Sequence, residues 1–257
     1  MPEYIDLTGP ASADVLGPDS VVLLGMGAIE QHGAHLPVST DYTVADAYSR
    51  AVTAEVEGEL DVWRLPTLAF TKSDEHAWSS GTIWLSWDTL MRVLVDIGRS
   101  VAASPARRLV FLNGHGGNSA LLQVACRELR REFGLRTFLM HASVPVDQGG
   151  RSTAAPEDEL GLGVHGGYSE TSIMLHLRPD LVHMEHAVRS VPERMANYKK
   201  IGFGKPVSFG WLSNDFGTDG TIGDPTGATA EAGKAQFEAS VAGCVESLRE
   251  IATFLPG

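Results

Sequence analysis

Continuous apolar runs alternate along the chain with segments in which apolar residues recur every three or four positions. Val21–Gly25 is an apolar run that ends in glycine, as expected for a strand buried on both faces. Three further runs predict strands, and the periodic segments between and after the runs predict helices. The predicted strands are Val21–Gly25, Val62–Leu65, Leu109–Leu112 and Thr137–Met140; the predicted helices are Thr43–Val56, Leu85–Ala103, Ala120–Phe133, Glu170–Leu177 and Ala230–Phe254. This alternation predicts an α/β domain with a largely parallel sheet.

Four segments rich in glycine and polar residues separate these elements. Gly27–Asp41 and Asn113–Asn118 are predicted loops that directly follow strands, and Asn214–Thr226 is a loop rich in Gly and Asp. Gln148–Glu159 is polar throughout and predicts an exposed loop. We find no internal repeat and no linker that divides the sequence, so we expect a single domain over residues 1–257.

Composition and charge narrow the classes of partner. The 257 residues carry a formal net charge of −12, which would repel a phosphate backbone, so we expect no nucleic-acid partner. No apolar run approaches the ~18 residues of a membrane span, and the first residues are acidic rather than basic, so we expect a cytoplasmic protein with no membrane partner. Two cysteines far apart in sequence exclude a disulfide framework.

Three histidine-bearing segments carry the chemistry that the sequence suggests. Two of them, around Glu30–His32 and around His115, directly follow predicted strands, and ligands bind beyond the carboxyl ends of strands in open α/β sheets. The third segment runs from His165 to Glu170, and Asp41 is the last residue of the first segment. One histidine in a loop is usually a surface residue, but three beside glycines, with carboxylates nearby, favour a shared site for Zn²⁺, Mn²⁺ or Fe²⁺.

Two further histidines leave alternatives open. His35 follows His32 by three residues, so it either competes as a ligand or orders the loop and contacts another ligand. His76 lies in the polar segment Ser73–Trp78 ahead of a predicted helix. It either faces the pocket, where it would bind substrate, or lies on the surface.

The sequence resembles the creatininase family, the creatinine amidohydrolases and their relatives. Five motifs carry the resemblance and occur in the family order across nearly the whole chain. They are G-A-I-E-Q-H-G-A-H-L-P-V-S-T-D at residues 27–41, S-G-T at 80–82, N-G-H-G-G-N at 113–118, H-G-G-Y-S-E-T-S at 165–172 and G-D-P-T-G-A-T-A at 223–230.

The resemblance implies a three-layer α/β/α fold and a hydrolase that works with two divalent metal ions. Family ligands carry over as Glu30 and His115 for one metal and His32 and Glu170 for the other, with Asp41 between them. His165 matches the catalytic histidine, which would protonate the departing nitrogen. Family members are typically cytoplasmic homo-oligomers, often hexamers.

Four positions depart from creatininase itself. Gly117 replaces a carboxylate that helps to hold one metal, and Val164 replaces a glutamate. Ser143, or a near neighbour, and Gly161 align with two tryptophans that cover creatinine. These departures argue against creatinine as the substrate. They also leave the general base unnamed, because Glu30 is already assigned to a metal.

We therefore expect hydrolysis of an amide-type C–N bond in a small molecule or short peptide, with bonds other than peptide bonds favoured. The H-G-G-N form is similar to other branches: the peptidase of mycofactocin maturation, formamidopyrimidine deformylases and a hydrolase of an inositol-derived ketone. A metal-dependent isomerase or lyase and a silent metal-binding scaffold are the alternatives from other classes. His165 argues against the scaffold, since a scaffold needs no acid near its metals.

Overall fold

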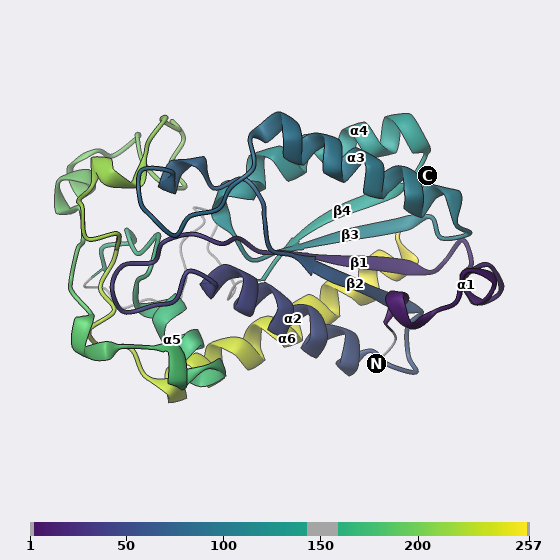
Figure 1. Ribbon diagram of the computed structural model, residues 1–257, viewed down its shortest axis with the longest axis horizontal. Coiled ribbons are helices and arrows are strands. Elements are labelled where there is room, and N and C mark those ends of the chain that lie inside the picture. Colours follow the sequence, from purple (N-terminus) through teal and green to yellow (C-terminus); the bar gives the residue numbers. More distant parts are fainter. Residues whose placement is uncertain (1–2, 143–158, 256–257) are drawn as a thin grey trace.

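The computed structural model describes residues 3–142 and 159–255, and within them a parallel sheet lies at the centre of the molecule (Figure 1). The sheet has four strands in the order β2-β1-β3-β4. Every neighbouring pair is parallel, as predicted. The strands are β1 (Val21–Met26), β2 (Val62–Leu68), β3 (Arg108–Asn113) and β4 (Arg136–His141).

Helices cover both faces of the sheet and give the three-layer α/β/α arrangement that the resemblance implied (Figure 1). Helices α2 and α6 pack on one face, α3 and α4 on the other, and α5 packs against α6 beyond the carboxyl ends of the strands. The described helices are α1 (Gly9–Val15), α2 (Thr40–Glu55), α3 (Trp87–Ala103), α4 (Ser119–Phe133), α5 (Tyr168–Leu177) and α6 (Ala230–Thr253). None of them is long and apolar enough to cross a membrane.

Successive residues of the central strands enter two separate hydrophobic cores. Val21 and Leu23 join the core on the side of α2 and α6, whereas Val22 and Leu24 join the core under α3 and α4. Side chains alternate between the faces of a strand, so a strand covered on both faces needs apolar residues at every position. This is why β1 appears in the sequence as an unbroken apolar run.

Three elements extend two or three residues beyond a predicted bound, and four others extend by a single residue at one or both ends. Helix α2 begins at Thr40 rather than Thr43, so Asp41 lies in its first turn, where a carboxylate is favoured by the helix dipole. Strand β2 continues through Pro66 to Leu68; it is the edge strand of the described sheet beside β1, and an edge strand tolerates a proline. Helix α5 begins at Tyr168, which places Glu170 in its first turn.

The prediction of an exposed loop over Gln148–Glu159 is wrong at Glu159. This residue is only 1% exposed, because its Oε1 accepts hydrogen bonds from the backbone N–H groups of Tyr168, at 2.9 Å, and Asp224, at 2.7 Å. It thereby joins the start of α5 to the loop before α6. Residues 148–158 and Ser143 lie outside the described residues.

The contact between α5 and α6 depends on Gly233 and gives a stability prediction. A Cβ atom at this position would overlap the carbonyl oxygen of Ser172 and lie 2.8 Å from the backbone nitrogen of Ile173. Neither backbone atom can move without shifting α5, so Gly233→Ala is expected to lower the free energy of unfolding by about 1–3 kcal/mol or more. Urea titration measures the change.

Gly243 provides the matched control in the same helix. No atom lies within 4 Å of the position of its missing Cβ, so Gly243→Ala is expected to stabilise the protein by up to about 1 kcal/mol through helix propensity. Equal effects of the two substitutions would contradict the close packing of α5 on α6.

Candidate metal centre

The histidine-bearing segments meet beyond the carboxyl ends of the strands, where the sequence analysis placed them. Glu30 and His32 follow β1, and His115 follows β3. Two glycines let α2 come close enough to add Asp41. A Cβ at Gly27 would lie 2.5 Å from the Cα of Tyr42, and one at Gly114 would lie 2.9 Å from the Cβ of Ala45. The first two turns of α2 therefore pack directly on both loops.

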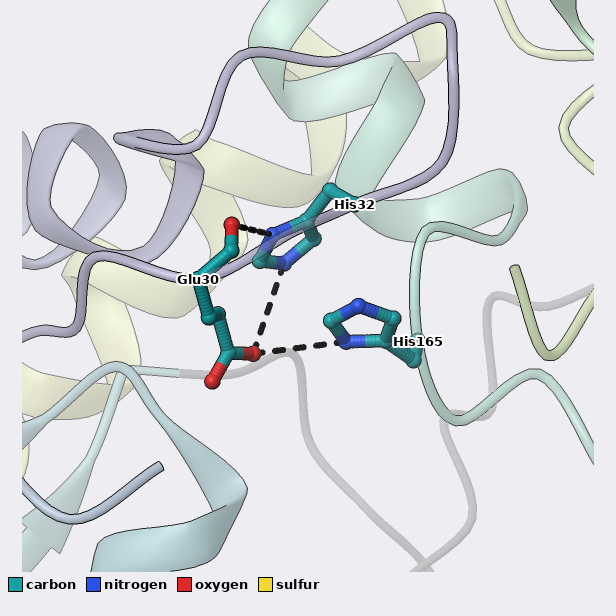
Figure 2. Close-up of side chains that lie close together, drawn as sticks. All are labelled: Glu30, His32 and His165. Carbon is teal, nitrogen blue, oxygen red and sulfur yellow. Dashed lines mark hydrogen bonds and ion pairs between the residues drawn. The ribbon is translucent and has the colours of Figure 1, made fainter. Parts of the chain in front are cut away.

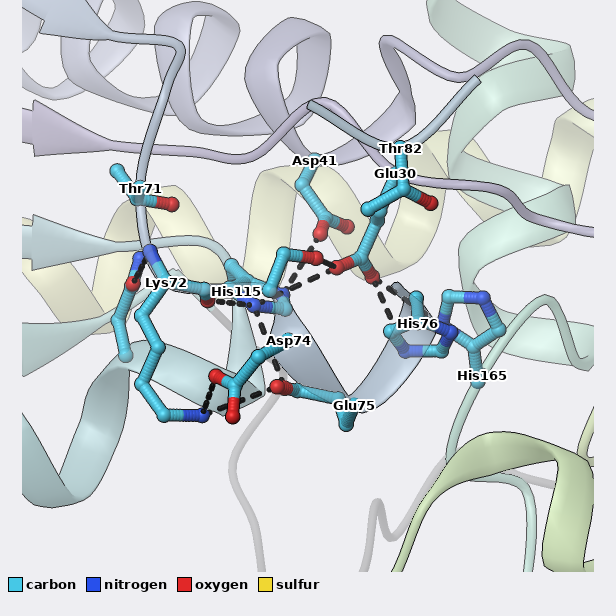
Figure 3. Close-up of polar contacts among 12 residues, drawn as sticks. Glu30, Asp41, Thr71, Lys72, Asp74, Glu75, His76, Thr82, His115 and His165 are labelled. Atoms are coloured by element: carbon cyan, nitrogen blue, oxygen red, sulfur yellow. Dashed lines mark hydrogen bonds and ion pairs between the residues drawn. The ribbon is translucent and has the colours of Figure 1, made fainter. Parts of the chain in front are cut away.

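Asp41 lies between two histidines and directs one carboxylate oxygen at each of them. Its Oδ1 is 3.2 Å from His32 Nε2, and its Oδ2 is 2.9 Å from His115 Nδ1. Glu30 Oε2 approaches His115 Nε2 at 3.4 Å, and Glu170 Oε2 approaches His32 Nε2 at 3.7 Å. Figure 3 shows Asp41, from the start of α2, converging with Glu30 and His115 from the loops after β1 and β3.

These five residues form two groups whose donor atoms lie close enough together to hold a metal ion. One group is Glu30, Asp41 and His115, and the other is His32, Asp41 and Glu170. Asp41 belongs to both groups, as expected for a ligand placed between two ions. The structure thus brings together all five predicted ligands in the pairs that the family resemblance implied.

Buried atoms without hydrogen bonds show that the residues fit cations. Glu30 Oε1, His32 Nε2 and Asp41 Oδ2 are all buried, and none of them has a hydrogen bond of good geometry. The nearest groups to the last two atoms are other proposed ligands, Asp41 Oδ1 at 3.2 Å from His32 Nε2 and His115 Nδ1 at 2.9 Å from Asp41 Oδ2. Buried polar atoms without partners are costly and rare. Divalent cations are the partners that carboxylate oxygens and imidazole nitrogens share, so the unsatisfied atoms match the proposed ligands.

The charges of the cluster strongly shift its pKa values. Burial opposes the charged forms of His32 and His115, but neighbouring carboxylates raise the pKa of each to about 10. The strongest of these carboxylates is Asp41 for His32 and Glu30 for His115. Burial raises the pKa of Glu30 to about 8, while the two histidines hold the pKa of Asp41 well below its usual value despite burial. Glu30, His32 and His115 therefore carry protons that a bound metal ion would have to displace, whereas Asp41 is already ionised.

His165 lies beside the cluster, and its hydrogen bonding identifies the ring nitrogen that faces inward. Its Nε2 lies 2.5 Å from the carbonyl oxygen of Gln31, so Nε2 carries the hydrogen. Its Nδ1 lies 3.4 Å from Glu30 Oε1 (Figure 2). Burial and the charges of His32 and His76 lower the pKa of His165 well below its usual value. Because Glu30, His32 and His165 could also hold an ion, a ligand role for His165 competes with an acid role.

His76 faces the pocket, so its alternative reading as a surface residue is wrong. It is 2% exposed, and its ring stacks on His165 with centroids 4.0 Å apart. The side-chain amide of Gln31 donates to His76 Nδ1 at 2.9 Å, which leaves Nε2–H directed at Glu30 Oε1, 3.5 Å away. Burial lowers the pKa of His76 to about 3, and the charges of His32 and His115 add to this.

His35 lies outside the metal-binding groups found among the described residues. Its Nε2 bonds Thr171 Oγ1 at 3.0 Å, in the helix that carries Glu170. Its backbone carbonyl accepts from the N–H of His183 at 2.8 Å. These contacts favour the reading in which His35 orders the loop and supports a ligand.

Of the segment after β2, sequence reasoning named His76 but missed Ser73 and Glu75. Ser73 Oγ donates to Glu30 Oε2, and Glu75 Oε1 lies 3.6 Å from His115 Nε2. They could have been found by treating the segment after β2 like the loops after β1 and β3, because ligands bind beyond the carboxyl ends of strands in open α/β sheets. The prediction ended β2 at Leu65, so Ser73–Trp78 was interpreted as the approach to a helix rather than as a loop beyond a strand end.

A cavity of about 60 Å³ opens onto the cluster, and its walls are partly apolar. Glu30, Asp41, His115 and Glu170 line it together with Glu75 and His76. Val164 and Trp211 also contribute to its walls. An aromatic ring therefore lines the site, although Gly161 carries none.

Comparisons with known proteins agree with the site. The profile of the creatininase family, described as creatinine amidohydrolase, matches residues 6–248. The mycofactocin precursor peptide peptidase of Mycobacterium tuberculosis is 34% identical over 100% of this chain and 94% of its own length. The creatinine amidohydrolase of Pseudomonas putida is 33% identical over 93% of this chain and 92% of its own length.

Solved structures agree in fold. A crystal structure of creatinine amidohydrolase superimposes with a TM-score of 0.75 at 26% identity, covering 98% of both chains. A structure described as creatininase Mn matches with a TM-score of 0.72 at 27% identity, covering 96% of this chain and 97% of its own. A creatininase variant described as Zn-Zn type matches with a TM-score of 0.72 at 26% identity, covering 96% of both chains. With the converging ligand atoms, these similarities show that the chain belongs to the creatininase family of metal-dependent amidohydrolases.

Proposed function

We propose that the protein binds two divalent metal ions, manganese or zinc, and hydrolyses an amide bond of a short peptide. Glu30 and His115 would hold one ion and His32 and Glu170 the other, with Asp41 bridging them. The observation that carries the proposal is the position of Asp41, whose two carboxylate oxygens face the two histidines at 3.2 and 2.9 Å. A carboxylate placed in this way can contribute one oxygen to each ion.

When bound, the metal pair would activate a water molecule and polarise the carbonyl group of the substrate. Hydrolysis adds the water oxygen to the carbonyl carbon and breaks the C–N bond, and a proton must reach the departing nitrogen. Nδ1 of His165, at the edge of the cluster, is the nitrogen placed to carry that proton. His76 is packed against His165 in the cavity wall, where it would contact the substrate.

The choice of a peptide rests on the pocket and on the relatives. Gly117 and Gly161 offer no carboxylate or ring, and Trp211 supplies an aromatic wall from a different segment. Four of the curated relatives, 32–35% identical, are named as mycofactocin precursor peptide peptidases. A small cyclic amide is the second candidate, because the P. putida creatinine amidohydrolase is almost equally similar.

A substrate panel separates the two candidates. The manganese- and zinc-loaded protein is assayed with synthetic peptides that cover a mycofactocin precursor and with creatinine, and mass spectrometry locates the cleaved bond. We expect cleavage of the peptide and a kcat/KM for creatinine below ~10⁴ M⁻¹s⁻¹, the low end of typical enzymes. Creatinine turnover above that value, with the peptides intact, would contradict the peptide assignment.

We further propose that the chain assembles as a cytoplasmic homo-oligomer, as the family resemblance implies. Apolar side chains around the start of α3 support this assembly. Ile83 is 56% exposed and Trp87 64% exposed, and Trp84 lies between them with 42% exposed. Exposed apolar groups gathered in this way are typical of protein–protein contact surfaces.

A further inference from the structure

The carboxylate of Glu75 occupies the space that a side chain at position 117 would need. A Cβ built on Gly117 would overlap Glu75 Oε1 and lie 2.9 Å from Glu75 Cδ. It would also overlap Nε2 of His115. Glycine at 117 and an inward-facing Glu75 therefore depend on each other, although they come from loops after different strands.

Several contacts fix Glu75 in this position. It is 7% exposed and lies in the short 3-10 turn Asp74–His76. The hydroxyl of Ser213 donates to its backbone carbonyl at 3.1 Å. Lys72 Nζ binds Oε2 at 3.0 Å, which leaves Oε1 directed at His115 Nε2, 3.6 Å away (Figure 3).

The two nitrogens of His115 have different surroundings. Nε2 lies 2.8 Å from the carbonyl oxygen of Lys72, so it carries the hydrogen, and two carboxylate oxygens lie near the same nitrogen, Glu30 Oε2 at 3.4 Å and Glu75 Oε1 at 3.6 Å. Nδ1 faces Asp41 and remains available for a metal ion. Histidines that bind metals commonly direct their other N–H at a carbonyl or carboxylate, which orients the ring and makes it a stronger donor.

We propose that Glu75 is a positioning residue for the metal ion assigned to Glu30, Asp41 and His115. Its carboxylate lies in the space that Gly117 leaves open. From there it orients His115 and increases the affinity of the site for that ion. The inference rests on the proposed two-metal function. It adds a contributor from the loop after β2 that none of the five sequence motifs contains.

Metal affinity of the full chain tests the proposal without reference to turnover. After chelator treatment, Mn²⁺ and Zn²⁺ are titrated into the wild-type protein and into Glu75→Gln, and competition with a chelating dye gives both affinities. Loss of a partner that orients a ligand typically weakens metal binding 10–100-fold. We expect Glu75→Gln to lose this factor for one of the two ions and to keep the other affinity unchanged.

Asp74→Asn is the matched control. Asp74 precedes Glu75 and binds the same Lys72 Nζ at 2.7 Å, but its side chain is 46% exposed and no contact with His115 is found for it. This variant is expected to bind both ions within about twofold of the wild type. The melting temperature of each ion-free variant measures loss of folding separately from loss of metal.

The outcomes distinguish this inference from the proposed function. A wild-type protein that binds fewer than two ions would contradict the proposed function itself. In another outcome the wild-type protein binds two ions, and Glu75→Gln loses no more affinity for either ion than Asp74→Asn does. That result would overturn only the role of Glu75. Weaker binding of one ion by Glu75→Gln, with the melting temperature of the ion-free protein unchanged, would support the role of Glu75.

Discussion

Replacing Asp41 by alanine is expected to remove both metal ions and to reduce hydrolysis by more than about 10³-fold, since metal ions supply several kcal/mol of transition-state stabilisation. The reason is geometric, because each oxygen of this carboxylate faces a different histidine. Elemental analysis should find close to two ions of zinc or manganese per wild-type chain and close to none in Asp41→Ala. No metal in gently purified wild-type protein would refute the two-metal proposal.

His115→Ala is the informative comparison for Asp41→Ala. His115 belongs to one group of ligands and His32 to the other, so His115→Ala should lose one ion preferentially. Thermal melts with added Mn²⁺ provide a second measurement, because an ion that binds only the folded state raises the melting temperature. An Asp41→Ala protein that keeps one ion at full occupancy would show that Asp41 does not bridge.

His165→Ala is expected to keep both metal ions and to lose about 10²–10⁴-fold in rate, the usual contribution of general acid catalysis. The hydrogen on Nε2 is directed at the carbonyl of Gln31, so Nδ1 is the nitrogen at the cluster. The loss should shrink for substrates with good leaving groups, which need little protonation. Turnover of amide substrates that differ in leaving group measures this dependence.

Three measurements on one preparation of His165→Ala separate its competing roles. If His165 is a sixth ligand, as its grouping with Glu30 and His32 allows, the variant should lose metal together with activity. If it only supports the loop, the melting temperature should fall and the rate per folded molecule should stay near that of the wild type. Either result would contradict the acid role.

Much of the fold was predictable because its signals are local. Strand Val21–Met26 is covered on both faces, so its sequence is an unbroken apolar run that can be recognised without the structure. Glu30, His32 and His115 were found as candidates because each lies in a glycine-containing loop directly after such a strand. Parallel strands end at the same edge of the sheet, so residues after two strands are expected to meet there. The pairing of ligands with metals required the family resemblance as well.

What the tertiary structure decided depends on contacts between segments distant in sequence. Asp41 reaches the centre because α2 begins three residues earlier than its periodicity suggests and packs on Gly27 and Gly114. Glu159, in a polar stretch, is buried because backbone N–H groups from the start of α5 and from the loop before α6 converge on it. Glu75 fills the space left at position 117 because the loop after β2 lies beside the loop after β3. Local pattern determines which residues form strands and helices; packing between loops determines which side chains share a site, because that depends on shape and on partners far along the chain.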